Sequence, residues 1–457
     1  MKLSTIKQVY VLGMGGVGVS AVAKLLQRHG VTVVGSDPHR NPLVEDLIRA
    51  GATYFADESP EHLPAGTDLL VYTDDAHEQH PIRQRAAALG IPAQNFSVTL
   101  DLLMRDYRQR IAIAGTNGKS TTTALTGLLL AGAGLDPTVF VGSRLTEFDG
   151  NVRLGSQQIF VAEADEYRDH FLHLRPTTAV ITNVELDHVD YFRTPQRLWQ
   201  SFHDFGSRLD PSHLIVNADD QSLAKHFPQA VTFGLADRAQ LRAINLQVTA
   251  GQQTFQVLWR EQNLGLMTLH VPGKFNVANA LAALAAALIA GAEPTTFAST
   301  LGAFRGIWRR FQILTAPTSP VTIVNDYAHH PTAVRVTLAG AREFFPGRRL
   351  VAVFQPHHHN RLTALFADFQ RCFGAADQTL IVETYTVPGR EPQTTDVKTS
   401  QQLVAALVAQ GQMASYAASP LAAEAWLRHL IQPGDVVLIM GAGDIWRMAE
   451  QLAALYA

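Results

Sequence analysis

One ten-residue segment, residues 114–123, restricts what this chain can fold into more than any other. It reads Ala-Gly-Thr-Asn-Gly-Lys-Ser-Thr-Thr-Thr and directly follows an apolar run with strand character. Its two glycines free the backbone, and Lys119 opens an alanine- and leucine-rich stretch whose helix N-terminus would attract an anion. In such a loop the lysine pairs with the β and γ phosphates of a nucleotide, and the hydroxyl of Ser120 or Thr121 binds Mg²⁺. The segment predicts a phosphate-binding loop.

The alternative is a tight strand-to-helix turn with an exposed lysine. The loop is shorter than the full Gly-x-x-x-x-Gly-Lys-Ser form, because Ile113 stands where the first glycine would be. It nevertheless keeps a glycine-freed backbone, an ammonium group and a hydroxyl. We therefore expect nucleotide phosphates with Mg²⁺ at this loop.

Length, charge and cysteine content exclude several classes of protein. A chain of 457 residues is long enough for about three domains. Its longest apolar stretch, residues 280–292, is too short to span a bilayer and predicts a buried helix. A net charge of −3 without a Lys/Arg block predicts no binding to nucleic acid or membrane surfaces. The absence of a signal-type N-terminus and a single cysteine, Cys372, fit a cytoplasmic protein with an inert buried thiol.

The order of elements predicts an α/β fold in three domains. Strand-like runs alternate with helical patterns throughout, which favours largely parallel sheets. We expect a Rossmann-like N-terminal domain at residues 1–106, a central P-loop ATPase-type mononucleotide-binding domain at 107–313 and a C-terminal Rossmann-like α/β domain at 314–457. The Pro/Ser/Thr-rich segment 315–320 is interpreted as a linker.

A second glycine-rich loop, residues 13–18, lies near the N-terminus. It reads Gly-Met-Gly-Gly-Val-Gly after a strand-like run, and Asp37 ends the next strand about 20 residues later, as in dinucleotide-binding folds. Only about 90 residues separate it from the phosphate loop, which is short for a complete dinucleotide domain. We expect it to hold a nucleotide diphosphate, which could be that of a UDP-sugar, with Asp37 near a ribose or base; a nicotinamide cofactor and a purely structural turn are the alternatives.

Two further strand-like runs in the central unit end in candidate metal ligands. One runs into Glu163-Ala164-Asp165-Glu166, the other leads to Asp187-His188. Parallel strands bring their carboxyl ends to one edge of a sheet, so Lys119, Glu163 and His188 should converge there. Ser120, Glu163 and His188 are the predicted metal ligands. The alternatives are that the acidic residues form a solvated loop and that His188 is a core histidine whose hydrogen bonds are made within the protein.

With these motifs the chain resembles a known family, the ATP-dependent Mur ligases of peptidoglycan precursor assembly. The resemblance covers essentially the whole chain. Besides the segments above, it rests on Phe171-Leu172-His173-Leu174, Thr182-Asn183, residues 272–280, Arg309-Arg310-Phe311, residues 326–332, Phe354-Gln355-Pro356-His357 and Gly441-Ala442-Gly443-Asp444-Ile445.

The resemblance implies a role for each domain: the first holds a UDP-sugar, the central one ATP and the third an amino acid. ATP would contact Gly115, Thr116, Asn117, Gly118, Lys119, Ser120, Thr121, Asn276, Asn279, Arg310 and Asp326. The other substrates would contact Gly13, Gly15, Gly16, Val17, Gly18, Asp37, Tyr327, His329, His358 and Arg361. The catalytic residues would be Lys119, His188 and His330.

Three positions bear on which member of the family the chain resembles. Asn117 and Ser120 are commoner in ligases that add later residues, whereas the branch that adds L-alanine to UDP-N-acetylmuramate usually has His and Thr. The lack of a lysine between His188 and Lys225 favours that L-alanine-adding branch. His358 stands where some members carry an arginine, which leaves Arg361 as the surer anchor for an amino-acid carboxylate.

The resemblance therefore implies an amide ligase that activates UDP-N-acetylmuramate with ATP and couples it to L-alanine, acting as a monomer or weak homodimer. His188, His329 or His330 would accept the proton of the amine, and hinges near residues 105–110 and 311–320 would let the domains close. The alternatives are a murein-recycling ligase that attaches a preformed peptide to the same sugar, a non-catalytic nucleotide-binding regulator and a nicotinamide oxidoreductase.

Overall fold

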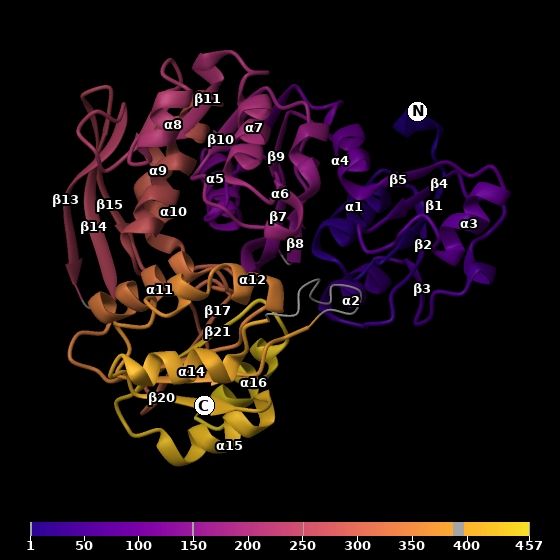
Figure 1. Ribbon diagram of the computed structural model, residues 1–457. Helices are drawn as coiled ribbons and strands as arrows, with labels where there is room; N and C mark the ends of the chain where they lie inside the picture. Colours follow the sequence, from indigo (N-terminus) through magenta and orange to yellow (C-terminus); the bar gives the residue numbers. More distant parts are fainter. Residues whose placement is uncertain (1, 149, 250, 387–396, 457) are drawn as a thin grey trace.

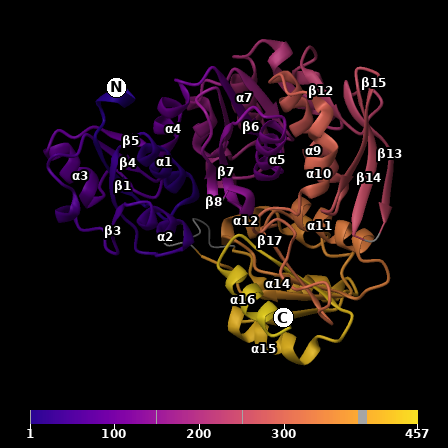
Figure 2. The same ribbon diagram turned by 180° about the vertical axis from the view of Figure 1, so that it is seen from behind.

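The chain folds into three α/β lobes. The computed structural model describes residues 2–148, 150–249, 251–386 and 397–456. In Figure 1 the N-terminal lobe is indigo, the central lobe purple to red and the C-terminal lobe orange to yellow. Seen from behind in Figure 2, the central lobe again adjoins both of the others. The predicted fold class, three α/β domains with Rossmann-like first and third domains, is confirmed.

The N-terminal lobe is a five-stranded parallel sheet in the order β3–β2–β1–β4–β5. Its strands are β1 (Gln8–Leu12), β2 (Thr32–Ser36), β3 (Thr53–Phe55), β4 (Leu69–Tyr72) and β5 (Ala93–Asn95), and its helices are α1 (Val17–Arg28), α2 (Pro42–Arg49), α3 (Pro81–Ala88) and α4 (Phe96–Met104). The strand order changes direction at β1 and β4. Open α/β sheets bind their ligands at such a switch point.

The central lobe contains a ten-stranded sheet in the order β15–β14–β13–β12–β11–β10–β6–β9–β7–β8. The strands are β6 (Gln109–Ala114), β7 (Thr138–Leu145), β8 (Gly150–Arg153), β9 (Ile159–Glu163), β10 (Thr178–Ile181), β11 (Leu214–Asn217), β12 (Val231–Gly234), β13 (Leu241–Thr249), β14 (Gln252–Trp259) and β15 (Gln262–Leu269). Strand β6 is parallel to both of its neighbours, β9 and β10. The sheet is more antiparallel than expected, because β13–β14–β15 and β7–β8 pair in antiparallel fashion.

The helices of the central lobe are α5 (Lys119–Gly132), α6 (Val189–Phe192), α7 (Pro195–Gly206), α8 (Gln221–His226), α9 (Lys274–Ile289) and α10 (Phe297–Ala303). Helix α9 is buried along most of its length, as predicted for the alanine-rich stretch. Among the residues that the structure describes, no helix combines the length and apolarity needed to cross a membrane.

The C-terminal lobe is a six-stranded sheet in the order β16–β17–β21–β18–β19–β20. Its strands are β16 (Gln312–Ile313), β17 (Thr322–Asp326), β18 (Leu350–Phe354), β19 (Gln378–Val382), β20 (Ala414–Ala417) and β21 (Val436–Met440). Its helices are α11 (Pro331–Phe344), α12 (His359–Ala364), α13 (Phe366–Phe369), α14 (Ser400–Ala409), α15 (Pro420–Leu430) and α16 (Ile445–Ala454).

The interpretation of residues 315–320 as a linker is wrong. Strand β16 pairs with β17 in antiparallel fashion, so these residues form the loop between two strands of one sheet. The third sheet therefore begins at Gln312, two residues before the boundary expected from composition. Pro, Ser and Thr favour a hairpin loop as much as an interdomain connection.

Apolar burial joins the first two lobes. A single cluster of buried side chains contains Val22 and Leu26 of α1 together with Phe160 of β9 and Phe202 of α7. The opposite face of the central sheet packs on α5 and α9, and each face of the third sheet has its own cluster. Cys372 is buried and burial raises its pKa, as expected for an inert thiol.

Close approach of β1 and β2 makes a glycine necessary at position 35. A Cβ atom there would lie 2.4 Å from the backbone oxygen of Val11. Replacing Gly35 with alanine should therefore force the strands apart and destabilise the N-terminal lobe by about 1–3 kcal/mol. Gly66→Ala, which adds its methyl group to open space, is the matched control. Thermal or urea unfolding of the two variants measures the difference, and equal stability would contradict this packing.

Candidate active site

The predicted phosphate-binding loop connects β6 to α5 and has no space for a side chain at its two glycines. A Cβ atom on Gly115 would lie 2.0 Å from the Thr182 hydroxyl, and one on Gly118 would lie 2.3 Å from the Asn279 side-chain oxygen. Both glycines also have positive φ, 130° and 87°. The loop thus needs glycine for space as well as for backbone conformation.

Residues after β10 fix the shape of this loop. The Asn117 amide donates to Oδ1 of Asn183 (2.9 Å), and Nδ2 of Asn183 donates to the Asn117 carbonyl (2.8 Å). The Thr116 hydroxyl donates to the carbonyl of Glu185 (3.0 Å). Because the loop is already hydrogen-bonded in this conformation, it is preorganised for an anion.

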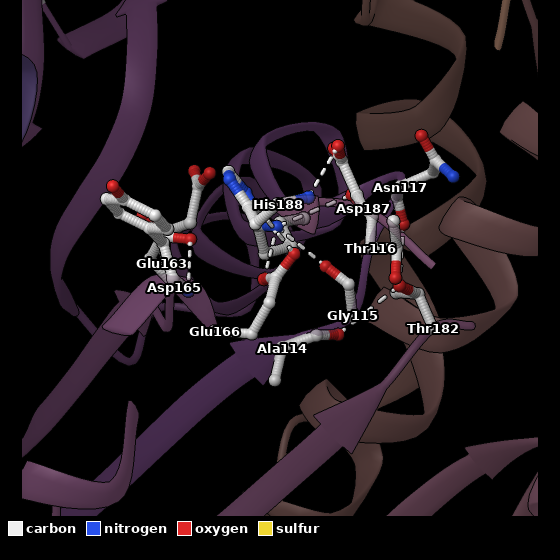
Figure 3. A network of polar contacts seen from close by, with 12 residues as sticks. Ala114, Gly115, Thr116, Asn117, Glu163, Asp165, Glu166, Thr182, Asp187 and His188 are labelled. Atoms are coloured by element: carbon white, nitrogen blue, oxygen red, sulfur yellow. Dashed lines mark hydrogen bonds and ion pairs between the residues drawn. The ribbon is translucent and has the colours of Figure 1, made fainter. Parts of the chain in front are cut away.

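The predicted convergence at the sheet edge is present. The Ser120 hydroxyl donates to Oε1 of Glu163 (2.9 Å), which joins α5 to the end of β9. Lys119 Nζ lies 2.6 Å from Oε2 of Glu166, and the other oxygen of Glu166 lies 4.0 Å from Nε2 of His188. Figure 3 shows Glu163, Glu166 and His188 gathered beside the loop. Strand order explains this, since β6 lies between β9 and β10.

Burial and charge shift the pKa values of these groups in related ways. Burial acts to lower the pKa of Lys119, but the carboxylates of Glu166 and Asp165 outweigh it, so the pKa is raised and the ammonium persists. Burial raises the pKa of Glu163 and of Glu166, and the Lys119 charge partly offsets both shifts. The edge therefore keeps the positive charge of Lys119 among buried carboxylates. The Arg310 guanidinium also lies there and donates to the Ser120 hydroxyl (3.4 Å).

The donor atoms at this edge fit Mg²⁺, which prefers oxygen ligands. The Ser120 hydroxyl and the Glu163 carboxylate are adjacent and could both reach one ion. A second group, Asp165, Glu166 and His188, offers three ligand atoms within 4.8 Å of one another. His188 belongs to this second group, whereas Ser120 and Glu163 form the first.

A cleft of about 1220 Å³ runs past this edge and is lined by all three lobes. Predicted site residues that line it are Gly15, Gly16, Val17, Gly18, Thr116, Asn117, Gly118, Lys119, Glu163, His188, Arg310, Tyr327, His329, His358 and Arg361. Within the described part of the chain, those that do not are Gly13, Asp37, Gly115, Ser120, Thr121, Asn276, Asn279, Asp326 and His330. The cleft thus brings together the loops predicted to bind nucleotide, sugar and amino acid.

In the N-terminal lobe, Asp37 shapes the glycine loop. Its carboxylate accepts hydrogen bonds from the amides of Gly15 (2.8 Å) and His39 (2.7 Å). The Asn41 side chain donates to the Gly15 carbonyl (2.9 Å). Gly15 has no room for a side chain, because a Cβ atom would lie 2.9 Å from both Asp37 and Asn41. Both carboxylate oxygens of Asp37 therefore accept hydrogen bonds from backbone amides.

Two third-lobe residues predicted to act on ligands also bond to the backbone. The Asp326 carboxylate accepts from the amides of Phe311 (2.7 Å) and Ala328 (2.6 Å). Nδ1 of His330 accepts from the amide of Thr332 (3.3 Å) at the N-terminus of α11. These bonds position the loop between β17 and α11, which carries Tyr327 and His329 into the cleft.

On α9, the two asparagines predicted to contact adenine lie behind the phosphate loop. Asn276 donates to the Pro272 carbonyl (2.7 Å), and Asn279 donates to Asn276 (3.2 Å). Both are buried, and Asn279 abuts Gly118.

A buried ion pair joins the third lobe to the central one. Arg361 donates to Oδ1 of Asp187 through Nε (3.0 Å) and through one terminal nitrogen (2.8 Å). Burial acts to raise the pKa of Asp187, but the Arg361 guanidinium outweighs it and holds that pKa well below its usual range. Asp187 also lies 3.7 Å from His329. Burial, aided by the Arg361 charge, lowers the pKa of His329 to about 4.

Sequence reasoning missed the roles of Glu166 and Asp187. Glu166 stands in the acidic run after β9, and that run is equally compatible with a solvated loop. Asp187 precedes His188, yet its partner Arg361 lies 174 residues away. Spacing along the chain indicates neither contact.

Comparison with known proteins agrees with this arrangement. Three family models cover most of the chain: "Mur ligase family, catalytic domain" at residues 8–108, "Mur ligase middle domain" at 113–287 and "Mur ligase, glutamate ligase domain" at 309–443. Two curated relatives are named UDP-N-acetylmuramate--L-alanine ligase. The protein of Caldanaerobacter subterraneus is 35% identical over 455 residues, 98% of each chain, and that of Laribacter hongkongensis is 39% identical over 464 residues, again 98% of each.

Solved structures of related ligases also match this chain. The UDP-N-acetylmuramate-alanine ligase of Thermotoga maritima matches with a TM-score of 0.84 at 27% identity over 99% of both chains. A murein peptide ligase of Psychrobacter arcticus matches with a TM-score of 0.71 at 25% identity over 98% of both.

Fold and site together define a three-domain α/β protein whose middle domain carries the loop predicted to bind phosphate. The chain belongs to the Mur ligase family, which confirms the family resemblance drawn from its motifs.

The lowered pKa of His329 has a consequence for stability. Its folded pKa of about 4 lies below the ordinary value of 6.5, so the unfolded chain binds this proton more readily. The free energy of unfolding should therefore fall as pH drops from 6.5 to 4, with up to about 3 kcal/mol coming from this group. His329→Gln should remove that part of the slope, while His213→Gln, at an exposed site, should keep it. Urea unfolding across this pH range is the measurement, and identical slopes in the two variants would contradict the assignment.

Proposed function

We propose that this chain is an ATP-dependent ligase that joins L-alanine to the lactyl carboxylate of UDP-N-acetylmuramate, in peptidoglycan precursor synthesis. The observation that carries the proposal is the single cleft onto which Lys119, Glu163 and His188 of the central lobe open. The glycine loop of the first lobe and Arg361 of the third lobe line the same cleft. Relatives with this activity in their names match over 98% of the chain.

The reaction takes two steps. The lactyl carboxylate oxygen attacks the γ-phosphorus of ATP, which forms an acyl phosphate and releases ADP. The amine of L-alanine then attacks the acyl carbon, phosphate leaves and the amine gives up a proton. A free carboxylate is a poor acyl donor, so phosphorylation supplies the leaving group.

The residues of the central lobe orient the phosphates of ATP and neutralise their negative charge. The Lys119 ammonium pairs with phosphate oxygens as negative charge spreads over them. Ser120 and Glu163 would hold Mg²⁺, and His188 would serve a second ion. Bound there, Mg²⁺ supplies positive charge that neutralises the phosphates.

The third lobe receives the amino acid. Arg361 pairs with its carboxylate, and Tyr327, His329 and His358 surround it in the cleft. Of the three histidines considered as proton acceptors, His188 and His329 line the cleft, whereas His330 caps α11. We therefore favour His188 or His329 as the group that accepts the proton of the amine.

The remaining parts of the proposal concern setting and assembly. ATP and nucleotide sugars are substrates of the cell interior, so we propose that the enzyme works in the cytoplasm. A monomer or weak homodimer, without nucleic-acid or membrane partners, remains our prediction.

The second candidate is a ligase that attaches a preformed peptide to the same sugar. The match to the Psychrobacter arcticus murein peptide ligase favours it to a lesser degree, because the TM-score is 0.71 against 0.84. The Phe354-Gln355-Pro356-His357 sequence resembles the L-alanine-adding branch instead.

Phosphate release from ATP tests the proposal and separates the two candidates. With UDP-N-acetylmuramate present, L-alanine should support faster release than glycine, L-serine or the L-alanyl-γ-D-glutamyl-diaminopimelate tripeptide. Lys119→Ala should lower kcat/KM by about 10²–10³-fold, because it removes a charge needed in the transition state. Lys225→Ala, an exposed lysine of the same lobe, is the matched control. Preference for the tripeptide would contradict L-alanine as substrate, and full activity of Lys119→Ala would contradict the site.

A further inference from the structure

The Lys119 ammonium is bound entirely by protein acceptors in this structure. It donates to the Gly115 carbonyl (2.7 Å), to the Thr116 carbonyl (3.4 Å) and to Oε2 of Glu166 (2.6 Å). An ammonium has three N–H donors, so these three oxygens use its full capacity. A phosphate oxygen can bind Nζ only by replacing one of them.

Glu166 stands behind the lysine, away from the cleft. Its side chain is 1% exposed, against 14% for Lys119. Lys119 lines the cleft, and within the described part of the chain Glu166 does not. A nucleotide that enters the cleft without a metal ion therefore meets the ammonium and not the carboxylate, so Glu166 acts on that nucleotide through Lys119.

Of the three acceptors, Glu166 is the strongest competitor with a phosphate. Its bond to Lys119 pairs two opposite charges, and such bonds are about twice as strong as neutral ones. The same carboxylate also cancels much of the positive charge that the loop presents to an anion. Both effects oppose phosphate binding.

We propose that Glu166 is a positioning residue that holds Lys119 inside the loop and competes with the nucleotide phosphates for its ammonium. This inference rests on the proposed ATP site. In this arrangement Lys119 stays ordered without ligand, and nucleotide binding includes exchange of a carboxylate partner for a phosphate partner. The contact thus lowers affinity for ATP while keeping the lysine close to where it acts.

The direction in which a substitution of Glu166 changes ATP affinity separates this role from a purely structural one. Glu166→Gln keeps the size and one acceptor oxygen but removes the charge. It should bind ATP about tenfold more tightly than the parent chain, because the competing partner is weaker. Loss of a merely structural contact would weaken binding instead.

Calorimetric titration of ATP in EDTA measures this effect without a divalent ion, which removes any contribution of Glu166 as a metal ligand. The matched control is Glu185→Gln. Glu185 lies 3.5 Å from the Asn117 side-chain nitrogen at the same edge, but among the described residues it forms no ion pair with Lys119. This control should change affinity much less than Glu166→Gln.

A double-variant cycle tests whether Glu166 acts through Lys119. In a Lys119→Met background, Glu166→Gln should no longer increase affinity. If Glu166→Gln fails to fold, as shown by circular dichroism, Glu166→Asp replaces it; its shorter side chain withdraws the carboxylate and should also tighten binding.

Unchanged or weaker ATP binding by the folded variant in EDTA would overturn the inference. If the variant binds ATP no more tightly in EDTA and more weakly once Mg²⁺ is added, Glu166 is a metal ligand. That result would also overturn the inference. These results are distinguishable from failure of the proposed function, which would appear as no L-alanine-dependent phosphate release by the parent chain.

Discussion

The hydrogen-bonded pairing of β6 with β9 on one side and β10 on the other is the constraint on which the site depends. It places three strand ends side by side, so that a lysine, a glutamate and a histidine from distant segments share one edge. Hydrogen bonds from residues 182–185 then hold the phosphate loop in its conformation. The glycines of that loop are required because its neighbours leave no space for a Cβ atom.

Two ion pairs hold cations of the site in place. Lys119 is held by Glu166 and Arg361 by Asp187, so two of the cations that we assign to substrate anions already have a carboxylate partner. Burying an unpaired charge is costly, which explains why both cations have a carboxylate partner within the protein. Each substrate anion would then take the place of an internal one, and binding energy would be partly offset by the lost pair.

Much of this follows from sequence because motifs and parallel-strand geometry are local. The loop at residues 114–123, the positions of Glu163 and His188 and the three α/β domains were all predictable for that reason. The pairing of Arg361 with Asp187 was not, since it joins segments far apart in the chain. Neither was the hairpin loop at residues 315–320, because composition does not distinguish it from a linker. Asp37 follows the expected motif, yet its carboxylate binds backbone amides, which spacing does not reveal.

The most direct test of the central claim is a crystal structure with a non-hydrolysable ATP analogue and Mn²⁺, in which anomalous scattering locates the metal. The account predicts that the γ-phosphate contacts Lys119 and that manganese lies between Ser120 and Glu163, on the side of the cleft that His188 also lines. Nucleotide bound elsewhere, or phosphates facing away from Lys119 with the metal remote from Glu163, would contradict it.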